Sequence, residues 1–132
     1  MNRALRQDVR RRANSKCEYC QVAQDDLPFA AFHVDHVIAR QHGGSDDFAN
    51  LAWCCHECNF HKGPNLSSVD PQTGQIVNLF NPRTLDWVEH FYVEGNYIRG
   101  RTAIGRATIL ALQLNSPDRV ELRAALRGSR EK

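Results

Sequence analysis

Residues 33–63 read HVDHVIARQHGGSDDFANLAWCCHECNFHKG and contain most of the chain's chemically reactive side chains. Five of the six histidines lie in this stretch, together with three of the five cysteines. It opens on the pair Asp35-His36, carries Asn50 near its middle, and closes on a Cys-x-x-Cys-Asn unit that runs from Cys55 to Asn59. We therefore expect the rest of the chain to support this segment or to bring a substrate to it.

The stretch predicts the order strand, loop, strand, helix. Residues 29–38 are apolar and β-branched enough for a strand, and the Gly-Gly and Asp-Asp pairs within residues 41–47 are typical of a turn. Residues 50–53 predict a short returning strand, and residues 56–62 a helix that ends at Gly63. Neighbouring residues of a regular strand point to opposite faces, so Asp35 and His36 reach one phosphate only if the strand ends, twists or bulges there.

Two Cys-x-x-Cys pairs predict a metal site. Four thiolates at this spacing suit a tetrahedral zinc ion, and a site whose four positions are all filled by protein is structural. A thioredoxin-like redox role needs only one such pair and a βαβ pattern, which the sequence lacks. Cys54 is left over. The predicted zinc ligands are Cys17, Cys20, Cys55 and Cys58.

Length and composition indicate one domain, residues 1–132, with an ordinary balance of apolar and charged residues. No run of 18 apolar residues is present and the N-terminus lacks an apolar signal core, so we expect a cytoplasmic protein. The net charge is only +2, but 14 of the 17 basic residues are arginines and many crowd the first 16 positions. This arrangement suggests a polyanionic partner, although a solvated helix face explains the charge as well.

The flanking segments predict further elements. Residues 3–14 have the spacing of a short amphipathic helix, residues 69–80 a turn or small hairpin, and residues 87–101 a second hairpin. Two helices are expected at the end of the chain, residues 103–114 and 117–126, with Ser116 as the N-cap of the second.

Oxygen ligands and one base remain within the central segment. Asp35 and Asn59 are hard ligands that suit Mg²⁺ or Mn²⁺. His36 can take a proton from water near neutral pH. The Asn50 amide is better suited to bridging the Gly43-Gly44 loop, which would fix the direction of His36.

These residues together resemble the HNH endonuclease family in its cysteine-containing, zinc-stabilised branch. The likeness covers about residues 14–64 and rests on the motifs CEYC, DHVI, HGG, NL and CHECNFHKG. It implies an α+β fold with a ββα-metal core, here flanked by an N-terminal helix and by an accessory region, residues 65–132, with a hairpin and helices. It also implies metal-dependent hydrolysis of DNA phosphodiesters that leaves 5′-phosphates, with His36 as general base, Asp35 and Asn59 as metal ligands and Asn50 orienting His36. The final letter of the H-N-H pattern is Asn59 here.

Two basic residues near the site, Arg40 and Lys62, are candidate phosphate contacts. The expected partner is DNA, with RNA as an open possibility. Two rival interpretations stay open: a zinc-stabilised module that binds nucleic acid without cutting it, and a zinc-stabilised interaction domain unrelated to nucleic acid.

Overall fold

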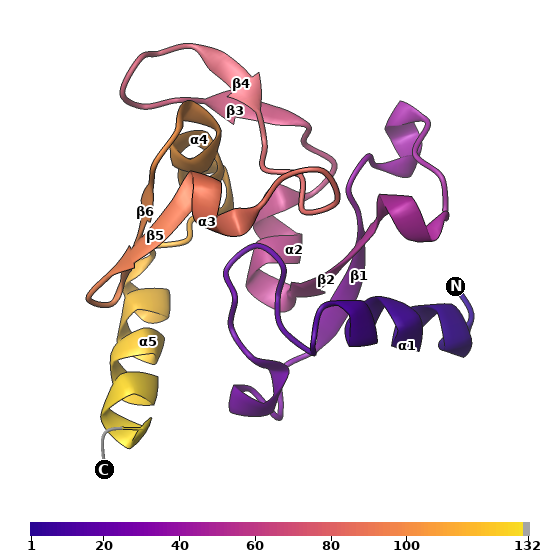
Figure 1. Ribbon diagram of the computed structural model, residues 1–132, viewed down its shortest axis with the longest axis horizontal. Helices are drawn as coiled ribbons and strands as arrows, with labels where there is room; N and C mark the ends of the chain where they lie inside the picture. Colours follow the sequence, from indigo (N-terminus) through magenta and orange to yellow (C-terminus); the bar gives the residue numbers. More distant parts are fainter. Residues whose placement is uncertain (131–132) are drawn as a thin grey trace.

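The computed structural model describes residues 1–130, so the last two residues of the predicted domain lie outside its description. Five helices and three antiparallel strand pairs make up this part of the chain (Figure 1). The helices are α1 (Arg3–Arg12), α2 (His56–Lys62), α3 (Trp87–His90), α4 (Ala103–Leu112) and α5 (Pro117–Arg130). The strand pairs are β1 (Phe32–His36) with β2 (Leu51–Cys55), β3 (Ser67–Val69) with β4 (Ile76–Asn78), and β5 (Phe91–Glu94) with β6 (Tyr97–Gly100). The predicted α+β class is confirmed.

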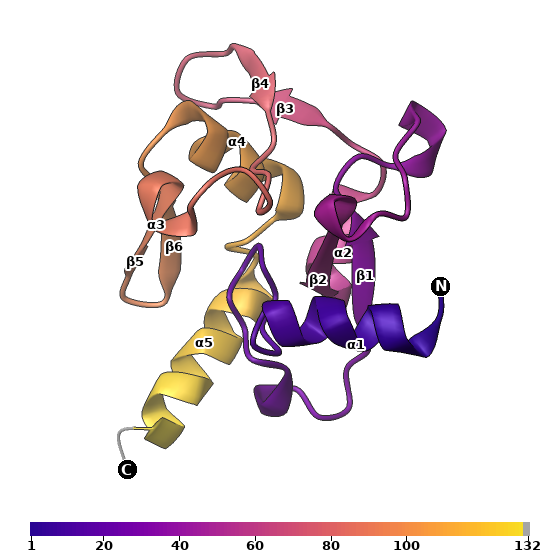
Figure 2. The ribbon, with the colours of Figure 1, turned by 45° about the vertical axis from the view of Figure 1, so that its right-hand side comes forward.

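The central unit consists of β1, β2 and α2. The two strands pair antiparallel in a register that sets Phe32 opposite Cys55 and His36 opposite Leu51. Helix α2 starts directly after β2 and packs against both strands (Figures 1 and 2). The predicted order of strand, loop, strand and helix is therefore confirmed, and the predicted helix of residues 56–62 has the observed bounds.

Helix α1 lies across the β1–β2 pair (Figure 2). Asn2 caps its N-terminus by accepting a hydrogen bond from the backbone N–H of Leu5 (2.8 Å). Arginines fill its last turn, where their positive charges interact favourably with the negative end of the helix dipole. Val9 is fully buried, and the Arg12 guanidinium donates to the carbonyls of Phe48 (2.8 Å) and Leu51. The helix is thus attached to the strand pair by both apolar and polar contacts.

The accessory region follows the predicted order with one difference. The β3–β4 hairpin is joined to α4 by the buried Asp70 carboxylate, which accepts two hydrogen bonds from Arg106 (2.9 and 3.0 Å). The second hairpin begins at Phe91 rather than at Trp87, because residues 87–90 form the helical turn α3. This turn lets the Trp87 ring stack on Phe91 (5.0 Å between centroids) while its Nε1–H donates to the Tyr19 carbonyl (2.8 Å).

One cluster of buried side chains links the central unit to the accessory region. Its largest members include Trp53 from the central unit, Tyr19 from the segment between α1 and β1, and Phe80 and Phe91 from the accessory region. Within residues 1–130, no helix is both long enough and apolar enough to cross a bilayer.

Candidate functional site

The four predicted zinc ligands meet in space. The Sγ atoms of Cys17, Cys20, Cys55 and Cys58 all lie within 4.8 Å of one another, and all four residues are buried. Cys20 Sγ and Cys55 Sγ are 3.7 Å apart. A tetrahedral ion with zinc–sulfur bonds of about 2.3 Å requires a separation of roughly 3.8 Å. The cluster therefore fits a zinc ion in ligand type and in size.

Two tight turns aim these sulfurs inward. The Cys20 N–H points to Cys17 Sγ (3.5 Å), and the Cys58 N–H points to Cys55 Sγ (3.4 Å). The second contact also caps the N-terminus of α2. Cys54 is buried but does not belong to the four-sulfur group. The turns thus place the metal centre between the N-terminal segment and the helix that carries Asn59.

A buried arginine balances the charge of the cluster. Burial raises the pKa of the Cys17 and Cys58 thiols well above the usual range, so their thiolates need a nearby cation. Arg119, only 8% exposed, donates to Cys58 Sγ at 2.9 Å and lies 3.8 Å from Cys55 Sγ. Burial opposes its charged form, yet these sulfurs hold the pKa of Arg119 above its ordinary value. This arrangement favours an anionic, metal-binding state of the cysteines.

Asp35 lies on the face of β1 that packs against α2. Its carboxylate is 5% exposed and accepts hydrogen bonds from the Tyr19 hydroxyl (2.6 Å) and from the Lys62 ammonium (3.3 Å). The Lys62 ammonium also forms an ion pair with the second carboxylate oxygen at 3.2 Å. Burial raises the pKa of Asp35, although Lys62 and Tyr19 act in the opposite direction. The carboxylate is therefore held rigidly by a residue between two zinc ligands and by a residue of α2.

Lys62 lies inside the domain rather than on a surface that faces DNA. Its side chain is 2% exposed, and its ammonium also donates to the carbonyls of His36 and Val37, both at 3.3 Å. An ammonium with this many fixed acceptors is not free to bind a phosphate. The structure thus corrects the expectation that Lys62 contacts phosphate: it fixes the end of β1 instead.

The His36 ring is held by the loop that follows β1. Its Nε2 lies 2.7 Å from Asp46 Oδ1, and the Arg40 guanidinium contacts the same oxygen (2.8 and 3.2 Å). The Asp46 contacts lower the pKa of that carboxyl, with the hydrogen bond to His36 as the main cause. Strand β1 is paired through His36, where it ends, and both members of the Asp-His pair line one cavity at that end.

Asn50 holds this loop closed. Its amide oxygen accepts from the Ile38 N–H (2.9 Å), while its Nδ2 donates to the carbonyls of Ile38 (3.0 Å) and Ser45 (2.8 Å). Gly43 adopts a left-handed φ of 88°, and a Cβ on Gly44 would stand 1.6 Å from the Ile38 carbonyl oxygen. The loop thus needs both glycines, and Asn50 fixes its backbone without contacting the His36 ring.

A cavity of about 310 Å³ lies between the end of β1 and α2. Its lining brings Asp35, His36 and Asn59 together, with Arg40 at its edge. Asn59 is half-buried, and its side-chain amide has no hydrogen-bond partner among residues 1–130. One hollow is therefore lined by residues that carry a base, a carboxylate and an amide, beside an arginine.

A comparison with protein-family models finds a match to HNH endonucleases over residues 17–65. Those residues contain both Cys-x-x-Cys turns, the β1–β2 pair and α2. Residues 17–65 form a domain of the HNH type.

A search of characterised proteins finds a likeness that extends beyond the HNH domain. The chain is 28% identical to the Septu protein PtuB of Bacillus thuringiensis over 116 residues, which cover 82% of this chain. The chain spans only 40% of the length of that relative. No solved structure matches the chain.

Three site contacts of the HNH domain were not anticipated from sequence. Tyr19 and Asp46 hold the two members of the Asp-His pair, and Arg119 reaches the zinc cluster from α5. Tyr19 stands between two predicted zinc ligands, and Asp46 follows the Gly-Gly pair. Their positions in the motif could therefore have indicated that they contact the site. Arg119 lies far from the motif in sequence, and its place on an amphipathic helix is the one sequence feature that suggests a buried contact.

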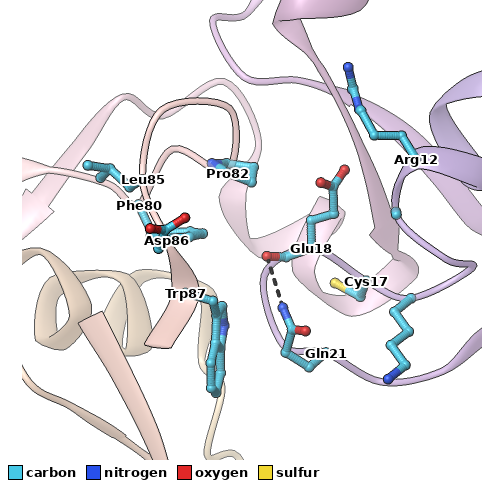
Figure 3. Close-up of a pocket in the computed structure, with 11 residues that line it drawn as sticks. Arg12, Cys17, Glu18, Gln21, Phe80, Pro82, Leu85, Asp86 and Trp87 are labelled. Carbon is cyan, nitrogen blue, oxygen red and sulfur yellow. Dashed lines mark hydrogen bonds between the residues drawn. The ribbon is translucent and has the colours of Figure 1, made fainter. Parts of the chain in front are cut away.

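A second cavity, of about 220 Å³, lies between the first Cys-x-x-Cys turn of the HNH domain and residues 80–87 (Figure 3). Figure 3 shows Glu18 and Cys17 on one side of it and Asp86 and Trp87 on the other. Glu18 accepts from the Trp53 N–H (2.7 Å) and pairs with Arg83. The predicted catalytic residues do not line this cavity, and Glu18 joins the two regions of the chain.

Proposed function

We propose that the protein is a metal-dependent endonuclease that hydrolyses phosphodiester bonds of DNA, in line with the nucleic-acid-related function implied by its HNH domain. The main support is the cavity that Asp35, His36 and Asn59 line together. Each residue comes from an element whose position is fixed by the zinc cluster or by Asn50. The whole activity of the longer PtuB relative is not assumed for this chain.

The donor set of the cavity suits a hard divalent ion. Asp35 and Asn59 offer a carboxylate and an amide oxygen, the ligand types that Mg²⁺ and Mn²⁺ prefer. A carboxylate has about four lone-pair directions, and the Tyr19 and Lys62 contacts leave room for one further partner. A bound ion would polarise the scissile phosphate and stabilise the leaving oxygen.

His36 is the proposed general base. Its ring lines the same cavity, and its Nε2 is held by Asp46. A histidine in this position takes a proton from a water molecule that attacks phosphorus, and the neighbouring Asp46 stabilises the imidazolium that forms. Arg40, 64% exposed in its side chain, stands at the edge of the cavity, where it can bind a non-bridging phosphate oxygen.

The four-cysteine cluster has a separate role in this proposal. A zinc ion there would leave no position for water or substrate, so it would act on structure alone. It would fix the Cys17–Cys20 turn, whose Tyr19 hydroxyl holds Asp35. We also propose a cytoplasmic location, where cysteines stay reduced and available to a metal ion.

Plasmid cleavage tests the proposal. The zinc-loaded protein is incubated with supercoiled DNA and Mg²⁺ or Mn²⁺, beside the variants His36→Ala and Asn59→Ala and the matched control His42→Ala. His42 is exposed on the adjoining loop and belongs to none of the site contacts described above. We expect cleavage by the wild type and by the control, and a loss of at least a hundredfold in the two site variants. Equal cleavage by wild type and His36→Ala contradicts the assignment of the base.

A binding module without nuclease activity is the second candidate. The observation that favours it is the pairing of Asp35 with Tyr19 and Lys62, because a catalytic metal ligand does not require these two contacts. Under this alternative the wild type shifts DNA in a gel at low salt but leaves the plasmid intact with either metal.

A further inference from the structure

A row of rings from β1 and α2 lies next to the cavity. His33 Nε2 lies 3.2 Å from His56 Nδ1, and the two ring centroids are 5.4 Å apart. The His56 and Phe60 rings are nearly parallel, with 22° between their planes and 6.5 Å between their centroids. Phe60 in turn meets His61 edge-on at 5.2 Å. We call His33, His56, Phe60 and His61 the ring row.

Phe60 is the exposed centre of the ring row. Its side chain is 71% exposed, although the burial of a phenyl ring away from water normally stabilises a folded protein. The row consists of planar rings and holds no aliphatic side chain, and its flanking carboxylate, Glu57, lies 3.4 Å from His61. Planar, polarisable rings with open faces are what unpaired nucleobases stack on.

The ring row leads into the cavity. Residues four apart on a helix share a face, as do residues three apart. His56, Asn59, Phe60 and the capping residue Gly63 therefore lie along one face of α2, and Asn59 and Gly63 line the cavity that holds His36. A nucleic-acid strand whose bases stack on Phe60 would therefore lie next to the proposed base, His36.

The end of the ring row at His33 lies next to the arginines of α1. Arg3, Arg6 and Arg10 share one face of α1 and are all exposed. Arg6 donates to the Phe32 carbonyl (2.7 Å), next to His33, and the charge of Arg6 contributes to lowering the pKa of His33, after burial and His56. Arginines on one side and open rings on the other match the phosphates and the bases of a single strand.

We propose that the α1 arginines and the ring row together form a track for an unpaired nucleic-acid strand that ends at the His36 cavity. The inference deepens the proposed function, since it rests on a nucleic-acid substrate, and it names the substrate class: single-stranded segments rather than continuous duplex. Stacking on Phe60 is the contact that distinguishes the two, because paired bases have no free faces to offer.

Binding measurements test the track without relying on cleavage. All proteins carry His36→Ala and are loaded with zinc, and the probes are a fluorescent oligo-dT strand and a duplex of the same length. Phe60→Leu keeps an apolar side chain without a ring, and Phe60→Trp keeps a ring. The matched control, Tyr97→Leu, removes a partly exposed ring from β6, which lies away from α1 and β1 (Figures 1 and 2).

We expect Phe60→Leu to weaken single-strand binding about tenfold and to leave duplex binding within twofold. Phe60→Trp and Tyr97→Leu should bind the strand as the parent does. Replacing Arg3 and Arg10 by Gln should reduce the slope of log affinity against log salt by roughly 1.4, since each of the two phosphate contacts to a single strand contributes about 0.7.

The track and the nuclease activity can fail separately. If wild-type protein cuts no nucleic acid but Phe60→Leu still loses single-strand binding selectively, the track stands and the nuclease proposal falls. If wild-type protein cuts DNA in a His36-dependent way but Phe60→Leu binds strand and duplex like its parent, the track is wrong. Absence of single-strand binding by the parent also overturns it.

Discussion

Arg119 of α5 donates a hydrogen bond to the Sγ atom of Cys58 across 2.9 Å, inside a region where the guanidinium is only 8% exposed. The same guanidinium donates to the Leu112 carbonyl at the end of α4 (3.0 Å). One side chain therefore fixes the last two helices to the metal centre of the HNH domain, and it supplies positive charge where four thiolates would gather.

Removing this charge should weaken zinc binding. We expect Arg119→Gln to lower zinc affinity about 10- to 100-fold, the usual effect of losing a partner that hydrogen-bonds a metal ligand. Competition with a chromogenic chelator measures the affinity. Arg127→Gln, an exposed change on the same helix, serves as the matched control and should bind zinc normally. Equal affinities for the two variants would show that the Arg119 contact does not matter to the metal.

Zinc should control the stability of the domain in a pH-dependent way. Burial raises the pKa of Cys17 and Cys58, so zinc must displace protons from thiols to bind, and its affinity rises with pH. We expect the melting temperature with zinc to fall steadily from pH 8 to pH 5, while the chelated protein melts lower and depends less on pH. Mg²⁺ should not restore the chelated protein. A melting temperature that is unchanged by chelation at pH 8 would contradict a structural metal site.

Single and double substitutions should measure how much the buried Lys62–Asp35 pair contributes to the free energy of unfolding. Lys62→Met leaves the Asp35 carboxylate buried without its cation, which should cost about 3–5 kcal/mol of unfolding free energy at pH 7. The double variant Lys62→Met/Asp35→Asn should recover much of this loss. Lys16→Met, an exposed change, should have little effect. Urea unfolding measures all four proteins.

The pH dependence of that loss has a definite sign. Burial already raises the pKa of Asp35 in the folded wild type, and removal of Lys62 raises it further. The loss in Lys62→Met should therefore be complete at pH values above the folded pKa of Asp35. It should shrink as the pH falls through that value toward the unfolded pKa of about 3.9. A loss that grows toward acid pH would exclude the buried carboxylate as its cause.

Asp46 should matter for catalysis through His36. Its carboxylate lies 2.7 Å from the His36 ring and is otherwise exposed, so Asp46→Asn should change orientation and charge at the base with little effect on folding. We expect kcat to fall roughly 10- to 100-fold, with a shifted pH–rate profile and an unchanged melting temperature. Asp47→Asn, at the next and equally exposed position, is the control. Matching pH–rate profiles for the two variants would remove Asp46 from the mechanism.

Local patterns predicted much of this structure because the responsible interactions are themselves local. The spacing of the two Cys-x-x-Cys turns and the change from strand-like to helical residues at Cys55 indicated the central unit, and Ser116-Pro117 marked the start of α5. The helical turn of residues 87–90 was missed, because it depends on the packing of Trp87 against Tyr19 and Phe91.

The candidate site was predictable in composition but not in its contacts. The motif placed His36, Asn50 and Asn59 within one unit, and β1 ends at His36, where the Asp-His pair was expected to need a break in the strand. The burial of Lys62 depends on the length of its side chain and on where the end of β1 lies beneath α2, which a sequence pattern does not contain. Predicting the contact between Arg119 and the cysteine cluster requires knowledge of how a helix distant in sequence packs.

The four residues Cys17 to Cys20 form one turn with three attachments. The two cysteines belong to the metal cluster, Tyr19 holds the Asp35 carboxylate, and Glu18 binds β2 and Arg83. A chain that has not yet taken up zinc therefore lacks the support on which its proposed cutting centre depends. Under the proposed function, newly made protein would cut no DNA until metal uptake completes the fold, so zinc supply would set when activity begins.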